Sequence, residues 1–257
     1  MMRYGKIGIR RSIAIKSKYR FEIMEKLTSN ERERYSRMIS LPEMGEKAII
    51  NLKKAKVLVI GAGGLGSATV PVLAAAGLGY LGLAKFDKVE KSNLQRQLLY
   101  TPSDIGKEKI EIASQKAALL NPEIHLEKFS TRIDETNSKK IIEDFDLVLD
   151  CTDNFPTRYL INDTCANLKK PLIYASVSDY EAIVTILHNK HNINLRDIFP
   201  EMPKKPSATG IMPTLPMIIG SIQANEAIKM LTQTGDILDG KLLSYNIQNN
   251  SYQVVSL

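Results

Sequence analysis

Short apolar runs and segments of helical period alternate along the chain from about residue 33 to its end. Apolar runs bounded by turn residues indicate strands, and apolar residues spaced three and four apart indicate helices. The predicted strands span residues 57–60, 80–87, 146–150, 172–177, 182–187, 241–247 and 252–257, with a weaker alternation over 125–131. The predicted helices span residues 66–76, 107–120, 158–168 and 217–231. This alternation predicts an α/β fold with a doubly wound sheet.

Three further segments refine this picture. The run at 146–150 is apolar at its interior positions, which is typical of a parallel strand covered on both faces. The last two predicted strands are separated by Asn249-Asn250, a turn sequence that favours a terminal hairpin. We therefore expect a Rossmann-like, mainly parallel sheet with antiparallel strands at its C-terminal end. Residues 189–216 carry five prolines and are expected to form a long loop, which in a compact domain is often functional.

The first 23 residues show a different pattern, in which apolar and basic positions alternate with period two. One parity carries Ile7, Ile9, Ile13, Ile15, Tyr19, Phe21 and Ile23, and the other carries Lys6, Arg10, Lys16, Lys18 and Arg20. Period two is typical of a half-buried strand or strand pair, whereas a mitochondrial transit peptide is amphipathic at the helical period. We therefore predict an N-terminal basic β-arm and linker over residues 1–32 and one domain over residues 33–257. A targeting segment and a flexible basic tail are the alternatives for the arm.

Composition and charge narrow the classes of function. The chain has 257 residues, is 44% hydrophobic and has a net charge of +7. Residues 1–20 carry seven Lys or Arg residues and no acid, so the rest of the chain holds 28 basic and 28 acidic residues. Because the excess charge belongs to the arm, we predict no nucleic-acid partner, although a pI of about 9.2 first suggests one. The sequence has no apolar run of about 18 residues, so no membrane span is expected.

The cysteines and histidines give little sign of catalytic chemistry. Two cysteines are too few for a disulfide framework or a four-cysteine zinc site. This cysteine poverty fits a reducing compartment, so a cytoplasmic location is expected. Cys151 ends a predicted strand and Cys165 lies on a predicted helix, so both are expected to be buried small residues. His188 and His191 lack catalytic spacing and are expected on the surface.

A glycine-rich loop follows the predicted strand at 57–60 and opens a helix. It reads Gly61-Ala62-Gly63-Gly64-Leu65-Gly66. In a G-x-G-x-x-G loop the first glycine permits a tight turn, the second lets the backbone approach a phosphate, and the third lets helix and strand pack closely. The helix N-terminus then faces the anion. Alone this pattern indicates only some nucleotide, against a purely structural turn, and the absence of a following G-K-[ST] excludes a Walker loop.

Charged residues follow the predicted strands at the sheet edge where ligands bind in open α/β folds. Lys85 and Asp87 lie two residues apart at the end of the second strand and are expected on one face. Arg96 and Lys109 would supply positive charge to a polyphosphate. Asp153 could hold Mg²⁺, which takes one or two carboxylates together with phosphate oxygens and water. Each residue alone could be a solvated surface residue, but their joint placement favours a site.

Together these segments resemble the ThiF/MoeB/HesA family, the ubiquitin-activating-enzyme-like adenylyltransferases. The matching segments are Arg34-Tyr35-Ser36-Arg37, residues 57–66, Ser92–Gln97, residues 105–109, Leu149–Asn154 with Arg158, and Gly220–Lys229. They recur in family order from about residue 33 to 247, and residues 1–32 lie outside the resemblance.

The resemblance implies an enzyme that uses Mg-ATP to adenylate the C-terminal carboxylate of a small ubiquitin-like carrier protein or a ribosomally made peptide. By family position, the nucleotide is bound by Gly61, Gly63, Gly64, Gly66, Asp87, Asn93, Gln95, Arg96 and Lys109. The implied catalytic residues are Arg37, Arg96, Lys109 and Asp153, and Asp153 would also coordinate Mg²⁺. Arg37 would reach the phosphates in the other subunit's active site, which implies a homodimer.

The sequence departs from the family at its zinc and thiol positions. The family carries two Cys-x-x-Cys pairs for structural zinc, and the first would fall at Asn194-Leu195-Arg196-Asp197. Neither pair is present, so we expect no zinc and expect packing to hold the long loop and the terminal hairpin. Members that form a thioester or persulfide use a loop cysteine, whereas Lys204–Gly210 contains none. We therefore expect adenylation without a covalent thiol intermediate at the family position.

A third departure concerns the ribose. The acid that binds the ribose in the family is replaced by Lys85, whose ammonium cannot accept a hydrogen bond. Asp87 remains, and either takes over the ribose contact or serves the metal. Two other functions stay open: a non-catalytic relative that acts as a binding partner, and an NADP-dependent reductase in which Lys85 grips a 2′-phosphate. The arm is expected either to grip a small acidic carrier or peptide, or to pair with a sheet edge or the dimer mate.

Overall fold

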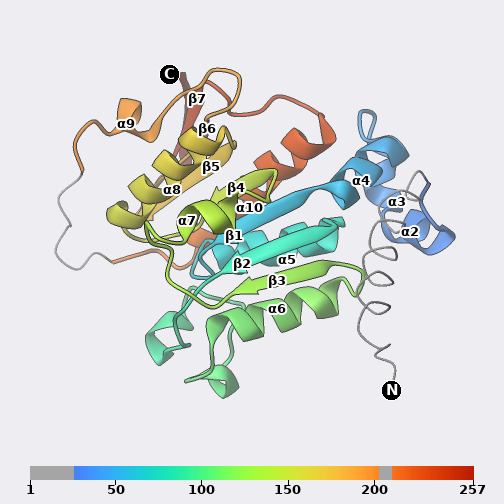
Figure 1. Cartoon of the computed structure of the whole chain (residues 1–257), viewed down its shortest axis with the longest axis horizontal. Helices are drawn as coiled ribbons and strands as arrows, with labels where there is room; N and C mark the ends of the chain where they lie inside the picture. Colours follow the sequence, from blue (N-terminus) through green and yellow to red (C-terminus); the bar gives the residue numbers. More distant parts are fainter. Residues whose placement is uncertain (1–25, 203–209) are drawn as a thin grey trace, which may run out of the picture.

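One mixed sheet forms the centre of the molecule in the computed structural model, which describes residues 26–202 and 210–257 (Figure 1). Its strand order is β3-β2-β1-β4-β5-β6-β7-β8. The strands are β1 (Lys56–Ile60), β2 (Tyr80–Ala84), β3 (His125–Phe129), β4 (Leu147–Asp150), β5 (Leu172–Ser178), β6 (Glu181–Leu187), β7 (Lys241–Asn246) and β8 (Ser251–Ser256). Pairing is parallel from β3 to β5 and antiparallel from β5 to β8. The predicted sheet is confirmed, whereas the period-two pattern of the predicted arm lies in residues 1–25, outside the described residues.

Helices cover both faces of this sheet. The α-helices are α2 (Ser29–Arg34), α3 (Ser36–Ile39), α4 (Gly45–Lys54), α5 (Gly66–Ala76), α6 (Lys109–Leu120), α7 (Ser138–Ile142), α8 (Phe155–Leu168), α9 (Leu195–Ile198) and α10 (Thr214–Thr232). Successive strand side chains point to opposite faces. Val57 and Val59 of β1 accordingly pack with α5, α6 and α10, while Leu58 and Ile60 pack with α7 and α8. Burial on both faces explains why the central strands are continuous apolar runs.

Several element boundaries differ from the prediction. β2 ends at Ala84, so Lys85 and Asp87 lie in the connection after the strand and not on a strand face. α8 begins at Phe155, earlier than predicted. The long loop predicted over residues 189–216 contains α9 and the first residues of α10. The differences at β2, α8 and α10 fall at the edge of the sheet where the parallel strands end, which is the edge that carries the predicted site.

Helices α2, α3 and α4, which the sequence pattern did not predict, pack at the opposite edge. The Thr28 side chain caps α2 as part of a capping box. Tyr35 packs against Gly77, the residue after α5. The contact is so close that a Cβ added at Gly77 would lie 2.7 Å from the tyrosine ring. Arg34 donates a hydrogen bond to the carbonyl oxygen of Leu120, the last residue of α6. Because α5 and α6 end here, this edge lies one helix length from the glycine loop, about 16 Å for α5.

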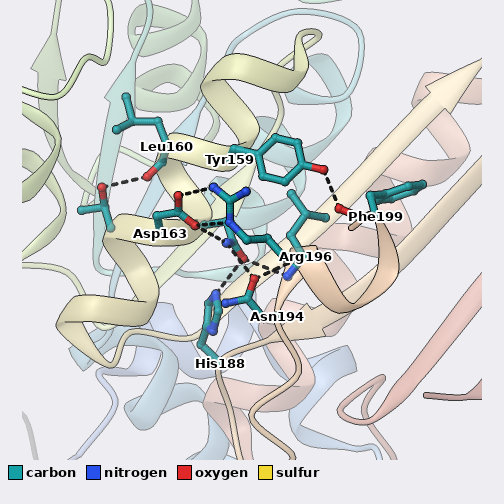
Figure 2. A network of polar contacts seen from close by, with 10 residues as sticks. Tyr159, Leu160, Asp163, His188, Asn194, Arg196 and Phe199 are labelled. Atoms are coloured by element: carbon teal, nitrogen blue, oxygen red, sulfur yellow. Dashed lines mark hydrogen bonds and ion pairs between the residues drawn. The ribbon is translucent and has the colours of Figure 1, made fainter. Parts of the chain in front are cut away.

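A polar network ties α9, at the start of the long loop, to α8 (Figure 2). The Arg196 guanidinium donates to both carboxylate oxygens of Asp163, at 2.6 and 3.2 Å, and lies 4.6 Å from the Tyr159 ring centroid. The Tyr159 hydroxyl donates to the Phe199 carbonyl oxygen at 2.6 Å. Directed polar contacts therefore hold this segment, together with the packing of the buried Leu195 side chain.

Asn162 lies fully buried at the centre of this network. Its side-chain oxygen Oδ1 accepts hydrogen bonds from the Leu195 backbone amide at 3.0 Å and from His188 Nε2 at 2.8 Å. Its amide nitrogen donates to Asn194 at 3.1 Å and to Asp163 at 2.9 Å. His188 is thus buried, contrary to the surface position expected for it, and burial lowers the pKa of its imidazole.

Replacing Asn162 with alanine is expected to lower the free energy of unfolding by about 2–4 kcal/mol, because two buried donors lose their acceptor. Denaturant unfolding of the full chain measures this effect. Asn167→Ala is the matched control, since Asn167 lies exposed on the same helix. Equal stability of the two variants would contradict the role given to Asn162.

Candidate functional site

A pocket of about 90 Å³ opens at the C-terminal ends of the parallel strands. It is lined by Ile60 and Gly61 at the end of β1, Ala84 to Asp87 at the end of β2, Thr131 to Ile133 after β3, and Thr152 to Asn154 with Thr157 after β4. β1 lies between β2 and β4, so the direction of the strand order reverses at this point. Ligands bind at such a switch point in open α/β sheets. The pocket therefore lies where the sequence predicted a site.

Close packing requires the first and third glycines of the G-x-G-x-x-G pattern but not the second. Gly61 has a φ of 107°, and a Cβ there would lie 2.4 Å from the carbonyl oxygen of Cys151. A Cβ at Gly66 would lie 2.4 Å from the carbonyl oxygen of Gly61. At Gly63 the nearest atom would be Nε2 of Gln97 at 3.7 Å, an ordinary contact. Close packing therefore does not explain Gly63, which fits the approach of a phosphate to the backbone.

The end of the glycine loop and the start of α5 complete this feature. A Cβ at Gly64 would lie 2.9 Å from Cβ of Pro216 on α10, so this glycine has a packing role. Leu65 occupies the cap position of α5 and provides no side-chain cap. An α-helix N-terminus whose amides lack side-chain caps favours an anion. The local geometry thus fits the triphosphate of a nucleotide.

Lys85 and Asp87 form an ion pair beside this loop. Nζ of Lys85 lies 2.7 Å from Oδ2 of Asp87, and both residues line the pocket. The backbone of this segment is fixed at both ends, because the Lys85 amide donates to Phe129 O at 3.2 Å and the Lys109 amide donates to Asp87 O at 2.9 Å. The structure therefore brings together the two residues that the sequence placed two positions apart.

Lys109 is buried, with a relative exposure of 5%. Burial is the main cause that lowers the pKa of its ammonium group, and the nearby charge of Lys85 adds to the effect, while Asp87 opposes it. Its Nζ lies 6.0 Å from the ring centroid of Tyr100, whose hydroxyl donates to the carbonyl oxygen of Ala62 at 2.7 Å. Lys109 is thus a buried cation close to the glycine loop.

The predicted residues Asn93, Gln95 and Arg96 lie in the connection between β2 and α6. Asn93 is buried, and its side-chain oxygen Oδ1 accepts a hydrogen bond from the Glu90 backbone amide at 3.2 Å. Arg96 is half-buried and donates to the Ser92 carbonyl oxygen at 3.1 Å, while Gln95 is exposed. Among the described residues, the lining of the pocket does not include these three. The structure therefore places them outside the pocket lining, with the backbone of Arg96 close to Gly64 of the glycine loop.

Asp153 lies exposed on the turn after β4 and lines the pocket. Hydrogen bonds from buried side chains hold this turn in place. Asp150 accepts a hydrogen bond from the Thr152 amide at 2.8 Å, and complete burial raises the pKa of the Asp150 carboxyl. Arg158 donates to the Thr152 carbonyl oxygen and to Ser176 Oγ, both at 2.9 Å. Arg158 thus positions the Asp153 turn, a role that the sequence analysis did not assign.

Sequence reasoning also missed the pocket residues that follow β3. Thr131, Arg132 and Ile133 line the pocket, and the Arg132 guanidinium lies 6.0 Å from the Phe86 ring centroid. The signal that could have found them is the rule already applied to the other strands, because β3 also ends at this edge. Apolar and polar residues alternate only weakly in this strand, so the position of its end was harder to predict from the sequence.

Both cysteines are free and buried. Burial is the main cause that raises the pKa of each thiol. Cys151 Sγ lies 3.1 Å from Oε1 of Gln223, whose amide nitrogen donates to the Asp150 and Ile173 carbonyl oxygens. The expected buried position of Cys151 and Cys165 is confirmed. The cysteine-free segment 204–210 lies almost entirely outside the described residues.

Arg37 lies exposed on α3, at the sheet edge opposite the pocket. Figure 1 shows α2 and α3, in blue, beside α4, which leads into the start of β1. The structure therefore does not bring Arg37 together with Lys109 and Asp153 of its own chain.

Residues 26–202 and 210–257 hold no group of three or more His, Cys, Asp or Glu side chains arranged for a metal ion. None of the helices in these ranges combines the length and apolar composition needed to cross a bilayer.

Comparison with known proteins gives consistent matches. The sequence profile of the ThiF family matches residues 35–257. The chain is 38% identical over 240 residues to the sulfur carrier protein adenylyltransferase of Thermus thermophilus, covering 90% of this chain and 89% of that protein. It is 38% identical over 248 residues to the adenylyltransferase and sulfurtransferase MOCS3 of Culex quinquefasciatus, covering 95% of this chain and 57% of that protein. The chain thus spans little more than half the length of the Culex relative.

A solved structure shows the same fold at lower identity. The structure of E. coli MccB with MccA-N7isoASN has a TM-score of 0.74 and 21% identity, covering 91% of this chain and 73% of that chain. E. coli MccB has also been solved with ATP, with a TM-score of 0.69 and 22% identity, covering 82% of this chain and 66% of that chain.

Proposed function

The chain belongs to the ThiF family, and from this premise we propose that it transfers the adenylyl group of ATP to the C-terminal carboxylate of a small carrier protein or peptide, releasing pyrophosphate. The profile match and the named relatives confirm the family resemblance and the adenylyltransferase class. The observation that carries the proposal is the gathering of the glycine loop, Lys109 and Asp153 at one edge of the sheet. The Thermus thermophilus relative and the MccB structure with ATP support it.

The chemistry suits the residues present. A C-terminal carboxylate is ionised at pH 7 and can attack the α-phosphorus without a general base. The P–O bond to pyrophosphate then breaks, and the protein must position the reactants and neutralise the departing charge. In this proposal Arg96 and Lys109 neutralise the phosphates, and the burial of Lys109 strengthens its field. The glycine loop receives the phosphates through its backbone.

Asp153 is the residue that would hold Mg²⁺ in this proposal. The site fits, because Mg²⁺ is usually bound by one or two protein carboxylates together with phosphate oxygens and water, and Asp153 is an exposed carboxylate in the pocket. When bound, the ion would supply additional neutralisation of phosphate charge. The contribution of this chain is to hold the Asp153 turn in place through Arg158 and Asp150.

The proposal includes a homodimer in which Arg37 acts on the partner's site. The support is geometric, because Arg37 lies one helix length from the glycine loop of its own chain, about 16 Å along α5. A closed two-fold dimer would give two equivalent sites, each completed by the other subunit.

Mixing two inactive variants tests this arrangement. Arg37→Ala and Asp153→Asn are each expected to be nearly inactive alone. A mixed dimer contains one site with Asp153 and a partner's Arg37, so co-refolded subunits should recover about a quarter of the wild-type activity. Size-exclusion chromatography with light scattering checks the dimer. Absence of recovery in a confirmed mixed dimer would contradict the role of Arg37 in trans.

The substrate and its surroundings are finer parts of the proposal. An acidic carrier or peptide would suit the seven basic residues in the first 20 positions of the arm. No thiol intermediate is proposed at the family position, since the burial of Cys151 and Cys165 keeps both thiols protonated. Free thiols also support the proposed cytoplasmic location.

Calorimetry and a carboxylate control test the proposed function. ATP is expected to bind the full chain, and pyrophosphate is expected to be released with a peptide or carrier that has a free C-terminus. The same substrate with a C-terminal amide is the control, because it has no carboxylate to attack. ATP binding without turnover on any substrate would favour a non-catalytic binding partner, whereas tight NADPH binding would favour the reductase.

A further inference from the structure

We propose that Asp87 is the group that recognises the ribose hydroxyls of the nucleotide, and that Lys85 is a positioning residue that holds the Asp87 carboxylate in place. This inference rests on the proposed function and makes it more specific. It assigns the two carboxylates of the pocket to different tasks, with Asp87 for the ribose and Asp153 for the metal.

Ribose hydroxyls need hydrogen-bond acceptors, and an ionised carboxylate offers about four lone-pair positions. A lysine ammonium offers only donors, so Lys85 cannot perform this task itself. Among the residues that line the pocket, Asp87 and Asp153 are the two carboxylates. The ribose contact must therefore come from one of them if a side-chain carboxylate makes it.

The position of each carboxylate in the sheet separates the two tasks. In dinucleotide-binding folds the acid that binds the ribose lies about 20 residues after the glycine loop, at the end of the second strand. Asp87 meets this description, since it follows β2. Asp153 follows β4, on the other side of β1. Asp87 therefore lies on the ribose side of the glycine loop, and Asp153 lies on the opposite side.

The ion pair shows how Lys85 acts. Its Nζ lies 2.7 Å from Oδ2 of Asp87, which leaves Oδ1 free to accept from the ribose. The lysine side chain is 15% exposed and the aspartate side chain is 35% exposed, so the carboxylate is the more accessible partner. Backbone hydrogen bonds fix the segment at Lys85 and at Asp87. Together these contacts pre-organise the carboxylate, which lowers the cost of ordering it on binding.

The Lys85–Asp87 ion pair makes two other roles unfavourable, namely 2′-phosphate binding by Lys85 and metal binding by Asp87. Lys85 is already neutralised by Asp87, so it is a weak site for a 2′-phosphate, whose charge would also be repelled by the carboxylate. A lysine on Oδ2 also hinders binding of a metal by both oxygens of Asp87. The arrangement therefore favours an unmodified ribose over NADP and directs the metal to Asp153.

Binding of ATP, 2′-deoxy-ATP and 3′-deoxy-ATP to the full chain, measured by calorimetry, tests this inference. Wild-type protein is expected to bind ATP about 10- to 100-fold more tightly than at least one deoxy analogue, as for a hydrogen bond to a charged group. In Asp87→Ala that ratio should fall to near one, while deoxy-ATP binding changes little. In Lys85→Met the ratio should fall by several-fold, and Lys85→Arg should restore it.

Glu111→Gln is the matched control. It removes a carboxylate–lysine pair of the same 2.7 Å length, between Glu111 on α6 and Lys128 on β3, away from the pocket. This variant should keep the wild-type ratio. A wild-type ratio in Asp87→Ala, or no discrimination in the wild type, would overturn the inference while leaving the adenylation proposal in place. NADPH binding that Lys85→Met abolishes would also overturn it. Failure of the wild type to bind ATP would overturn the proposed function itself.

Discussion

Asp153→Asn is expected to lower the rate of adenylation by at least about 100-fold, the scale of losing a charged group that stabilises the transition state. The substitution keeps the size and shape of the side chain and removes its charge. Asp153 is exposed, and its Oδ1 accepts a hydrogen bond at 3.4 Å from the Asn154 side chain, a contact that an amide oxygen can retain. The thermal midpoint should therefore stay close to that of the wild type.

Asp144→Asn provides the control for this prediction. Asp144 is an exposed carboxylate after α7 and does not belong to the pocket lining, so its neutralisation should leave the rate unchanged. Initial rates and thermal melts of both variants check the prediction. Full activity in Asp153→Asn would remove Asp153 from the catalytic residues, and an unfolded variant would show that the turn has a structural role instead.

Lys109→Met is expected to lower kcat/KM for ATP by about 10²–10³-fold, because a buried cation acts strongly on phosphate charge. The same substitution should leave stability unchanged or increase it. Burial disfavours the charged form of Lys109, as the direction of its pKa shift indicates, and methionine fills a similar volume without that cost. A loss of activity together with undiminished stability is the signature of a functional residue.

The pH dependence of the rate adds an independent measurement. The pKa of Lys109 is lowered by burial first and by Lys85 second, so its ammonium group loses its proton at a lower pH than a free lysine. Activity should therefore fall as the pH rises through that lowered pKa. Lys85→Met removes a nearby positive charge and should move this decline to higher pH. A decline that stays in place would contradict the coupling between Lys85 and Lys109.

The central part of the fold could be predicted because it depends on local patterns. β1 and β4 are buried on both faces, so their sequences are continuous apolar runs. The tight turn at Gly61 and the close packing at Gly66 leave no space for a side chain, so both positions require glycine and the loop can be recognised in the sequence. The strand-end rule then located Asp87 and Asp153 at the pocket.

Other features depend on contacts between distant segments and had no local signal. α2 is polar along its length and is stabilised by capping and by its neighbours. The burial of His188 follows from Asn162, which lies 26 residues earlier on α8. β2 ends at Ala84, so Lys85 and Asp87 lie in the connection after the strand and not on a strand face as predicted. Backbone hydrogen bonds hold this connection in place. The proposed phosphate contacts of Arg96 and Arg37 also need a bound nucleotide and, for Arg37, the proposed second subunit.

The exchange of labelled pyrophosphate into ATP tests the central claim most directly, because it reports reversible formation of an acyl-adenylate. The full chain is incubated with ATP, Mg²⁺, labelled pyrophosphate and a set of acidic carrier proteins and peptides. We predict exchange that requires a substrate with a free C-terminal carboxylate and disappears with its C-terminal amide and with Asp153→Asn. Exchange that persists with the amide, or no exchange with any substrate together with no ATP binding by calorimetry, would contradict the account.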